Sequence, residues 1–395
     1  MNIYEKIYEK KKLNNVISTY LSISTIGKIK LELVPSKYRM FKTVPSVIIV
    51  DGKTKVPLNT SWTILLSLFL IEVKKIKGKE INKEDLDNIY DLAVKKSKKI
   101  YHFARKKILK RDLENMINLF FDISNKKENS KIEAFDENKF IPNMKAPYSV
   151  EINIRKIKSE EELPTIKFKN IIDICKKNCI PRIIFSGEEP TIRGDLIEII
   201  EYAEDLTTYL NTDGVLLTKQ YCDRLYNARL DKIFITLFSN EPDIHNNLSI
   251  KKDFEKTVQG IKNAVTSKLD VTVITPISKL NKNYLDTLKF IKEIGVKKVC
   301  VYNDEKDKKN KLGKRDYSSI IKSAEKISKE EQIEFEIKGD ETFLNSITIM
   351  SDGNVISLNK NMGNILSKDW KKIWNSDEAL MLKYSSMKGG NKNEK

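Results

Sequence analysis

The amino-acid sequence predicts an α/β protein built around a partial (βα)6 barrel. Six short apolar segments between residues 149 and 302 alternate with segments of helical periodicity, which is the pattern of a parallel sheet with crossover helices. The chain has 395 residues, enough for two or three domains with their own cores. Its hydrophobic content of 40% is that of a globular chain. We therefore expect smaller domains on either side of the barrel.

The part of the chain that precedes the barrel is predicted to be a separate domain. Residues 1–34 are expected to form a helical lead-in, and residues 44–59 two strands around the turn pair Asp51-Gly52. Helices follow near residues 60–73, 83–99 and 106–123. A hairpin followed by helices is the outline of a winged-helix-like α+β domain, which we place at residues 35–125. The polar residues 126–146 are interpreted as a linker.

The barrel itself is predicted over residues 147–335. Its expected strands are Ser149–Ile154, Arg182–Ser186, Thr207–Asn211, Lys232–Leu237, Val271–Thr275 and Lys297–Tyr302. The expected helices are Lys167–Lys177, Asp195–Ala203, Lys219–Asn227, Lys252–Ser267, Lys282–Ile294 and Tyr317–Ser328. In such folds a ligand binds at the carboxyl ends of the strands.

After the barrel the pattern changes. Ser346–Leu358 is predicted to be a second hairpin that turns at Asp352-Gly353, and a connection and a helix follow it. We assign residues 336–384 to a C-terminal extension. Residues 385–395 are expected to be a disordered tail.

The net charge of +17 raises the alternative of a nucleic-acid-binding protein. The basic residues run through the whole chain between acidic ones, which favours solvated faces instead. Lys95–Arg111 is an exception: Ile100, Phe103, Ala104 and Ile108 fall on one face of a predicted helix whose other faces are basic. We interpret it as a packed surface helix, with a binding helix as the alternative.

Several features indicate a cytoplasmic protein. The most apolar run, Ile64–Ile71, is too short to span a bilayer, and the first residues have no apolar signal core. The four cysteines Cys175, Cys179, Cys222 and Cys300 are few and scattered, as in a reducing compartment. Of the two histidines, His245 could form an acid–base pair with Asp243, but a locally bonded loop residue is the favoured interpretation.

The segment with the clearest chemical signal is the turn Gly187-Glu188-Glu189-Pro190, which follows the second predicted strand. A glycine after a strand lets backbone N–H groups approach a ligand closely, and a carboxylate there can accept an ammonium group. The third predicted strand ends in Asn211-Thr212-Asp213-Gly214, and Thr236 ends the fourth. These residues are expected at one edge of the sheet.

The order of these segments resembles the radical S-adenosylmethionine (SAM) superfamily, in its peptide-modifying branch with a SPASM extension. The family has Gly-Gly-Glu-Pro where this chain has Gly187-Glu188-Glu189-Pro190, and Thr-Asn-Gly near Asp213. Ile233–Ser249 and Val271–Asn281 resemble its fourth and fifth strands, and SDGNVISL with GNILSKDWKKIWNS is similar to the SPASM extension. The N-terminal domain loosely resembles the recognition elements of enzymes that modify ribosomal peptides (RiPPs).

The chain departs from this family at its cluster ligands. The family binds a 4Fe–4S cluster through Cys-x3-Cys-x2-Cys after the first strand, but no cysteine stands there, and the extension has none after Cys300. Cys175 and Cys179 have the x3 spacing but are interpreted as structural, at the opposite end of the barrel. Glu188 replaces a glycine that lies close to SAM. We expect a vestigial SAM pocket at Gly187, Glu188, Glu189, Pro190, Thr212, Asp213 and Thr236, with weak or absent SAM binding, no 4Fe–4S cluster and no metal.

Three classes of function remain. The first is a pseudoenzyme without radical SAM catalysis, which binds a precursor peptide, a catalytically complete radical SAM enzyme, or both, in RiPP maturation. The second is an enzyme with non-radical chemistry that uses Glu188, Glu189 and Asp213. The third is a nucleic-acid-binding protein, which is disfavoured, as is membrane association. The sequence leaves homo-oligomerisation open.

Overall fold

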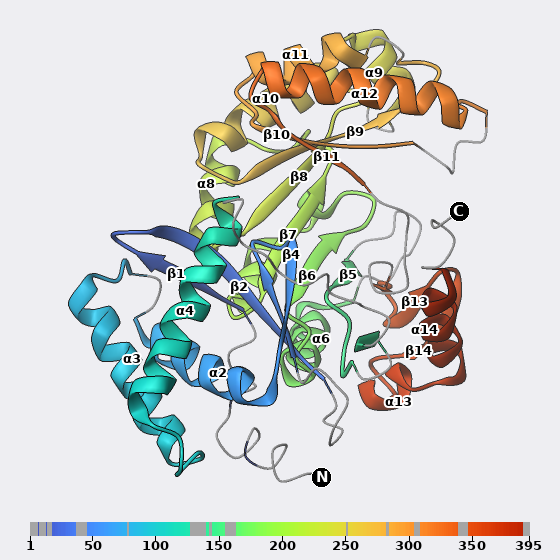
Figure 1. Ribbon diagram of the computed structural model, residues 1–395. Coiled ribbons are helices and arrows are strands. Elements are labelled where there is room, and N and C mark those ends of the chain that lie inside the picture. The colour runs from blue at the N-terminus through green and yellow to red at the C-terminus, as the bar shows by residue number, and fades with distance from the viewer. Residues whose placement is uncertain are drawn as a thin grey trace.

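The computed structural model describes residues 7, 13, 18–36, 46–76, 79–126, 140–141, 144–154, 163–249, 252–281, 284–303, 309–338 and 347–389. Two β-sheets organise these residues. A four-stranded sheet lies beside the lower ends of the barrel strands, and the C-terminal elements lie at the opposite end of the large sheet from α9–α12 (Figure 1).

The N-terminal sheet has the order β1-β2-β3-β4 and is antiparallel throughout. Its strands are Ser18–Ile23, Gly27–Pro35, Ser46–Val50 and Thr54–Leu58. The hairpin predicted around Asp51-Gly52 is confirmed as β3 and β4. The helical prediction for residues 1–34 is wrong over Ser18–Ile23 and from Gly27 onward, because these residues form β1 and β2. Ile29, Leu31 and Leu33 alternate with polar residues at the period of a strand, and hydrogen-bonded pairing follows that pattern.

Three helices cover one face of this sheet: α2 (Thr60–Lys75), α3 (Lys83–Lys98) and α4 (Lys106–Ser124). Asn59 and Asn82 cap the first two by accepting hydrogen bonds from the N–H groups of Trp62 and Asp85, each at 2.8 Å. The helices predicted near residues 83–99 and 106–123 are confirmed as α3 and α4, but the turn between them breaks the single helical face predicted over Lys95–Arg111. Phe103 lies fully exposed in the turn, so no continuous apolar face forms there.

The other face of the sheet lies on the amino ends of the barrel strands. Val34, Val47 and Ile49 belong to the same hydrophobic core as the barrel. Glu32 forms a two-point ion pair with Arg182, with the Arg182 Nε at 3.1 Å from its carboxylate. Ser18 shares a hydrogen bond of 2.8 Å with Thr207. The N-terminal domain therefore covers the floor of the barrel, which is the end where its strands begin. The edge where the strands end lies on the opposite side.

The large sheet has the order β11-β10-β9-β8-β7-β6-β5-β12-β13-β14, and β5 to β11 run parallel. The six predicted barrel strands are confirmed within two residues, and a seventh strand, β11, was not predicted. The strands are Val150–Asn153, Arg182–Ser186, Thr207–Thr212, Lys232–Thr236, Val271–Ile277, Lys298–Asn303 and Glu334–Ile337.

Helices follow these strands and bury the outer face of the sheet. They are α6 (Thr165–Lys177), α7 (Leu196–Tyr202), α8 (Lys219–Asn227), α9 (Pro242–Leu248), α10 (Phe254–Thr266), α11 (Tyr284–Glu293) and α12 (Lys314–Glu330). Ile183, Phe185 and Leu210 are fully buried against this helical layer. Their strand neighbours Ile184 and Tyr209 face the concave side and are partly exposed.

The C-terminal extension continues the sheet past β5. β12 (Thr348–Ile349) pairs in parallel with β5 and antiparallel with β13 (Asn354–Ser357), as predicted for the second hairpin, and β14 (Lys360–Asn364) follows. Trp374 of α13 (Trp370–Trp374) donates a hydrogen bond of 2.8 Å to the carbonyl of Met144, which anchors the extension.

Two boundary predictions need correction. The tail predicted from residue 385 is partly helical, because α14 runs from Asp377 to Gly389, and the rest of that prediction lies outside the described residues. The predicted linker also falls largely outside them, but Met144 and Ala146 at its end are buried in the barrel core. Within the described ranges, no helix has the length and apolar character needed to cross a bilayer.

Candidate functional site

The predicted site residues lie on turns at the carboxyl ends of neighbouring strands. The turn after β6 contains Gly187, whose φ of 132° is a conformation that favours glycine, and Pro190 begins a 3-10 helix, η3 (Pro190–Ile192). Thr212 is the last residue of β7, and Thr236 the last of β8. Because β6, β7 and β8 are adjacent in the sheet, the structure brings these residues to one edge, as the sequence predicts.

The Glu189 carboxylate joins two of these turns and is only 2% exposed. Its Oε1 accepts hydrogen bonds from the Thr191 N–H at 2.9 Å, the Thr191 hydroxyl at 2.5 Å and the Thr212 hydroxyl at 2.8 Å. Its Oε2 accepts one from the Asp213 N–H at 2.7 Å. Four donors of its own chain therefore surround this carboxylate, so it acts in this structure as a link between the ends of β6 and β7.

The turn after β7 is also fixed by internal contacts. The Asp213 carboxylate accepts a hydrogen bond of 2.9 Å from the Val215 N–H, and the Asp213 carbonyl accepts one of 3.0 Å from the Thr257 hydroxyl. Gly214 has a φ of 81°. A side-chain carbon on Gly260 of α10 would lie 2.0 Å from the Gly214 carbonyl oxygen, so glycine is required there. This turn is locked against α10.

The uncommitted polar groups at this edge are different ones. Glu188 is exposed and has no hydrogen-bond or ion-pair partner in the part of the chain that the structure describes. Asn153 Oδ1 and Ser186 Oγ are buried without a partner among the described residues, and the two residues face each other in the pairing of β5 with β6. Sequence reasoning missed both. Their signal was their position as the last residue of a strand, where polar side chains on the concave face meet a ligand.

The family comparison concerns this part of the chain. Residues 142–291 match the model of the radical SAM superfamily. These residues form a radical SAM domain. The family match covers the first five barrel strands and both turns that Glu189 connects.

Curated relatives agree with this assignment. An AdoMet-dependent heme synthase of Methanosarcina barkeri is 28% identical over 181 residues, which are 44% of this chain and 52% of the relative. A PqqA peptide cyclase of Bradyrhizobium diazoefficiens is 30% identical over 116 residues, which are 29% of this chain and 28% of the relative. The chain thus matches about half or less of the length of these relatives.

Solved structures extend the likeness beyond the radical SAM domain. One match is the crystal structure of Streptococcus suis SuiB bound to the precursor peptide SuiA, with a TM-score of 0.58 and 12% identity. The match covers 91% of this chain and 89% of the SuiB chain. The native anSMEcpe structure with bound AdoMet and the Cp18Cys peptide covers 61% of this chain and 84% of its own, with a TM-score of 0.52 and 16% identity. At these identities the likeness shows a shared fold, which for SuiB includes most of the chain.

Radical SAM proteins hold a 4Fe–4S cluster through three thiolates, and the thiols of this chain do not fit that group. Cys175, Cys179 and Cys222 belong to the hydrophobic core, and burial raises their pKa values to about 12, about 11 and about 12. Cys300 lies on β10, and burial raises its pKa to about 11. Residues 155–162, which follow β5, contain no cysteine and lie outside the described residues.

The described residues also contain no cluster of His, Cys, Asp and Glu suited to a metal ion. His245 is 1% exposed; its Nδ1 accepts a hydrogen bond of 3.3 Å from the Phe238 N–H, and the Phe238 and Phe254 rings pack edge-on to it. Burial lowers its pKa to about 4, so the imidazole is neutral at pH 7. His245 is therefore a locally bonded residue of the radical SAM domain.

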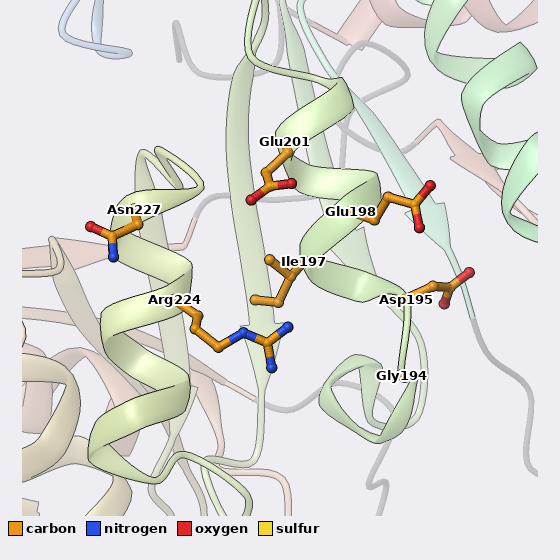
Figure 2. A pocket seen from close by; sticks show the side chains of 7 residues that line it. All are labelled: Gly194, Asp195, Ile197, Glu198, Glu201, Arg224 and Asn227. Atoms are coloured by element: carbon orange, nitrogen blue, oxygen red, sulfur yellow. The ribbon is translucent and has the colours of Figure 1, made fainter.

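A pocket of about 410 Å³ lies outside the barrel, between α7 and α8. Figure 2 shows Arg224 and Glu201 directed toward the space between the helices, while Asp195 and Glu198 extend away from Arg224. Asp195 is bound by Arg193 at 2.7 Å and Glu198 by Lys169 at 2.6 Å. Its acidic groups are thus largely committed to neighbours, and we assign it no chemistry.

Proposed function

We propose that the protein is a radical SAM-like pseudoenzyme without an iron–sulfur cluster, which binds a peptide or a partner enzyme in RiPP maturation. The observation that carries this proposal is the set of thiols. Four cysteines in the whole sequence stand on two helices, one helix end and one strand, and the loop after β5 has none. Without three thiolates on one loop, no iron site is prepared for SAM.

The arrangement of the remaining parts supports a binding role. We propose that the N-terminal domain is recognition-element-like; it was predicted at residues 35–125, and β1 and β2 extend its sheet back to Ser18. We propose residues 147–335 as the barrel and residues 336–384 as a degenerate SPASM-like extension. SuiB, which shares this fold over 91% of the chain, has been solved with a precursor peptide. We transfer peptide binding to this chain on that ground. The homologous PqqA peptide cyclase also acts, by its name, on a peptide.

A peptide that adds a strand to the N-terminal sheet would meet β1 rather than β4. Pro57 in β4 has no N–H to donate to a further strand. β1 is the other edge, and at one end it already pairs with an extended segment through Ile81, whose N–H donates to the Ser22 carbonyl at 2.8 Å. Peptide binding should therefore slow hydrogen exchange in Ser18–Ile23 and leave Thr54–Leu58 unchanged.

The test of the pseudoenzyme proposal is anaerobic reconstitution with iron and sulfide. We expect iron content near background and no 5′-deoxyadenosine from SAM after reduction. An iron content of about four per chain with the broad visible absorption of a cluster would refute the proposal. Calorimetry with SAM gives a second measure, and low-micromolar affinity would contradict the vestigial pocket.

The partner is tested separately, by anaerobic pull-down of the tagged protein from its native host with mass spectrometry. Recovery of a short precursor peptide, or of a radical SAM enzyme with its cluster cysteines, would support the proposal. Recovery of nucleic acid, with binding that weakens steeply with salt, would favour the nucleic-acid alternative instead.

A further inference from the structure

A second pocket, of about 420 Å³, lies between the N-terminal sheet and the amino ends of the barrel strands. It is on the floor of the barrel, at the opposite end of the strands from Glu189. Residues of both sheets line it, including Tyr20 and Lys30 of the N-terminal sheet and Tyr209 and Lys232 of the barrel. Six lysines and four carboxylates are among its lining residues.

All four carboxylates already have donors within the chain. Asp231 accepts hydrogen bonds from the Tyr20 hydroxyl at 2.6 Å, the Lys30 Nζ at 2.9 Å and the Thr208 N–H at 2.8 Å. Asp270 pairs with Lys298 at 2.8 Å, and Glu334 pairs with Lys53. Asp51 accepts from the Lys30 N–H at 2.7 Å and from the Ser124 hydroxyl. Each carboxylate of the lining therefore already has a hydrogen-bond or ion-pair partner.

Three lysines of the lining are left over. Lys28, Lys126 and Lys232 form no ion pair within the described residues. Lys28 is exposed, and its ammonium lies 4.1 Å from the centre of the Tyr20 ring. Lys126 is exposed at the end of α4. Both add positive potential to the pocket.

Lys232 is the least exposed of these three lysines. It is the first residue of β8, only partly exposed, and its ammonium lies 5.5 Å from the Tyr209 ring centre and 5.6 Å from that of Phe234. Burial lowers its pKa, while Asp270 and Glu336 act to raise it and Lys298 and Lys53 to lower it. A partly desolvated ammonium that lies near aromatic rings and forms no ion pair within the described residues gains from an added anion.

We propose that this pocket binds a small oxyanion, the carboxylate or phosphate of a metabolite-sized ligand, with Lys232 as its main contact. The anion would neutralise the unpaired lysines, and the Tyr20 and Tyr209 rings would border its remaining atoms. The volume accommodates a ligand of the size of an amino acid or a sugar phosphate. The site lies apart from the strand-end turns of the proposed vestigial SAM pocket, and its test does not depend on the absence of a cluster.

The test is calorimetry of the full chain at low ionic strength, with inorganic phosphate in one series and glutamate in another. We expect saturable binding in at least one series, and Lys232→Met, which keeps the aliphatic stem, should weaken it roughly tenfold or more. Lys322→Met, at an exposed lysine of α12, is the matched control and should leave binding unchanged. Binding of phosphate alone or of glutamate alone would identify the class of oxyanion.

Two outcomes would overturn the proposal. One is the absence of saturable binding of either anion to the wild-type chain, and the other is unchanged affinity in Lys232→Met. Circular dichroism and the unfolding midpoint of each variant establish that it is folded. Iron content and pull-down results do not enter this test, so failure here and failure of the pseudoenzyme proposal are separate findings.

Discussion

The ion pair between Glu32 and Arg182 is predicted to be the main polar link between the N-terminal domain and the barrel. Their side chains are 1% and 14% exposed, and the guanidinium bonds the carboxylate through two nitrogens. Arg182 also lies over the Tyr209 ring, with 4.9 Å from the guanidinium carbon to the ring centre. The pair is thus largely desolvated on both sides.

Removing one member should therefore cost far more than removing both. Glu32→Gln leaves the Arg182 charge without compensation, and Arg182→Met leaves a buried carboxylate, so each should lower the free energy of unfolding by about 3–5 kcal/mol. The double variant places a neutral polar group beside an apolar one and should lose less than the sum of the two. We expect a coupling energy of about 2–4 kcal/mol between the two positions.

Urea unfolding of the four proteins of this cycle measures that coupling. Far-UV circular dichroism follows the whole chain, and fluorescence of Trp62 on α2, with Trp370 and Trp374 changed to Phe, follows the N-terminal domain. The exposed pair Lys219–Asp223, four residues apart on α8, is the matched control and should show little coupling. A coupling energy below about 0.5 kcal/mol for Glu32 and Arg182 would refute the reasoning.

Three further predictions concern single groups. Glu189→Gln should lower the free energy of unfolding by about 2–3 kcal/mol because the Asp213 N–H loses a charged acceptor. Glu188→Gln, at an exposed position, should leave the free energy of unfolding unchanged. Equal effects of the two variants in urea unfolding would contradict this reasoning. The pKa of His245 falls from 6.5 to about 4 on folding, so the unfolded chain binds the proton more readily than the folded one. The free energy of unfolding should therefore decline as pH falls from 6.5 to about 4. His245→Phe should flatten this decline in thermal melts measured at a series of pH values. A thiol reagent should modify only Cys300 in the folded protein, and rapid labelling of all four cysteines, counted by mass spectrometry, would show that the core thiols are accessible.

The barrel was predictable because its segments carry their own periodicity. Arg182–Ser186 and Lys219–Asn227 were predicted to the residue, since an apolar run bounded by turn residues and a capped amphipathic stretch each specify one element. β2 was missed although Gly27–Pro35 alternates cleanly. It was included in a predicted helical lead-in, whereas the folded chain pairs Glu32 with Arg182, which lies 150 residues away in the sequence. No local pattern contains that partner.

The position of the candidate site's turns in the sheet was predictable, but their hydrogen bonding was not. Strand order alone brings Gly187, Thr212 and Thr236 to one edge, so the sequence located them correctly. The hydrogen-bond partners of Glu189 depend on the register between β6 and β7, in which Phe185 lies opposite Leu210. That register is seen in the folded structure and cannot be read from the sequence of either strand. Asn153 and Ser186 lie opposite each other in the pairing of β5 with β6, which is also seen only in the folded structure. For this reason the sequence did not identify them as polar groups without a hydrogen-bond partner among the described residues.

The structure separates what the Gly187–Pro190 turn contributes to the fold from what it contributes to chemistry. Gly187 needs its positive φ to leave β6, and Glu189 must be a carboxylate to accept four donors from two turns. Both requirements hold whether or not a ligand binds, so the sequence of this turn would persist in a chain that has lost its cluster thiols. A family signature at this position therefore reports the folding of the barrel, and the thiols on the preceding loop report its chemistry.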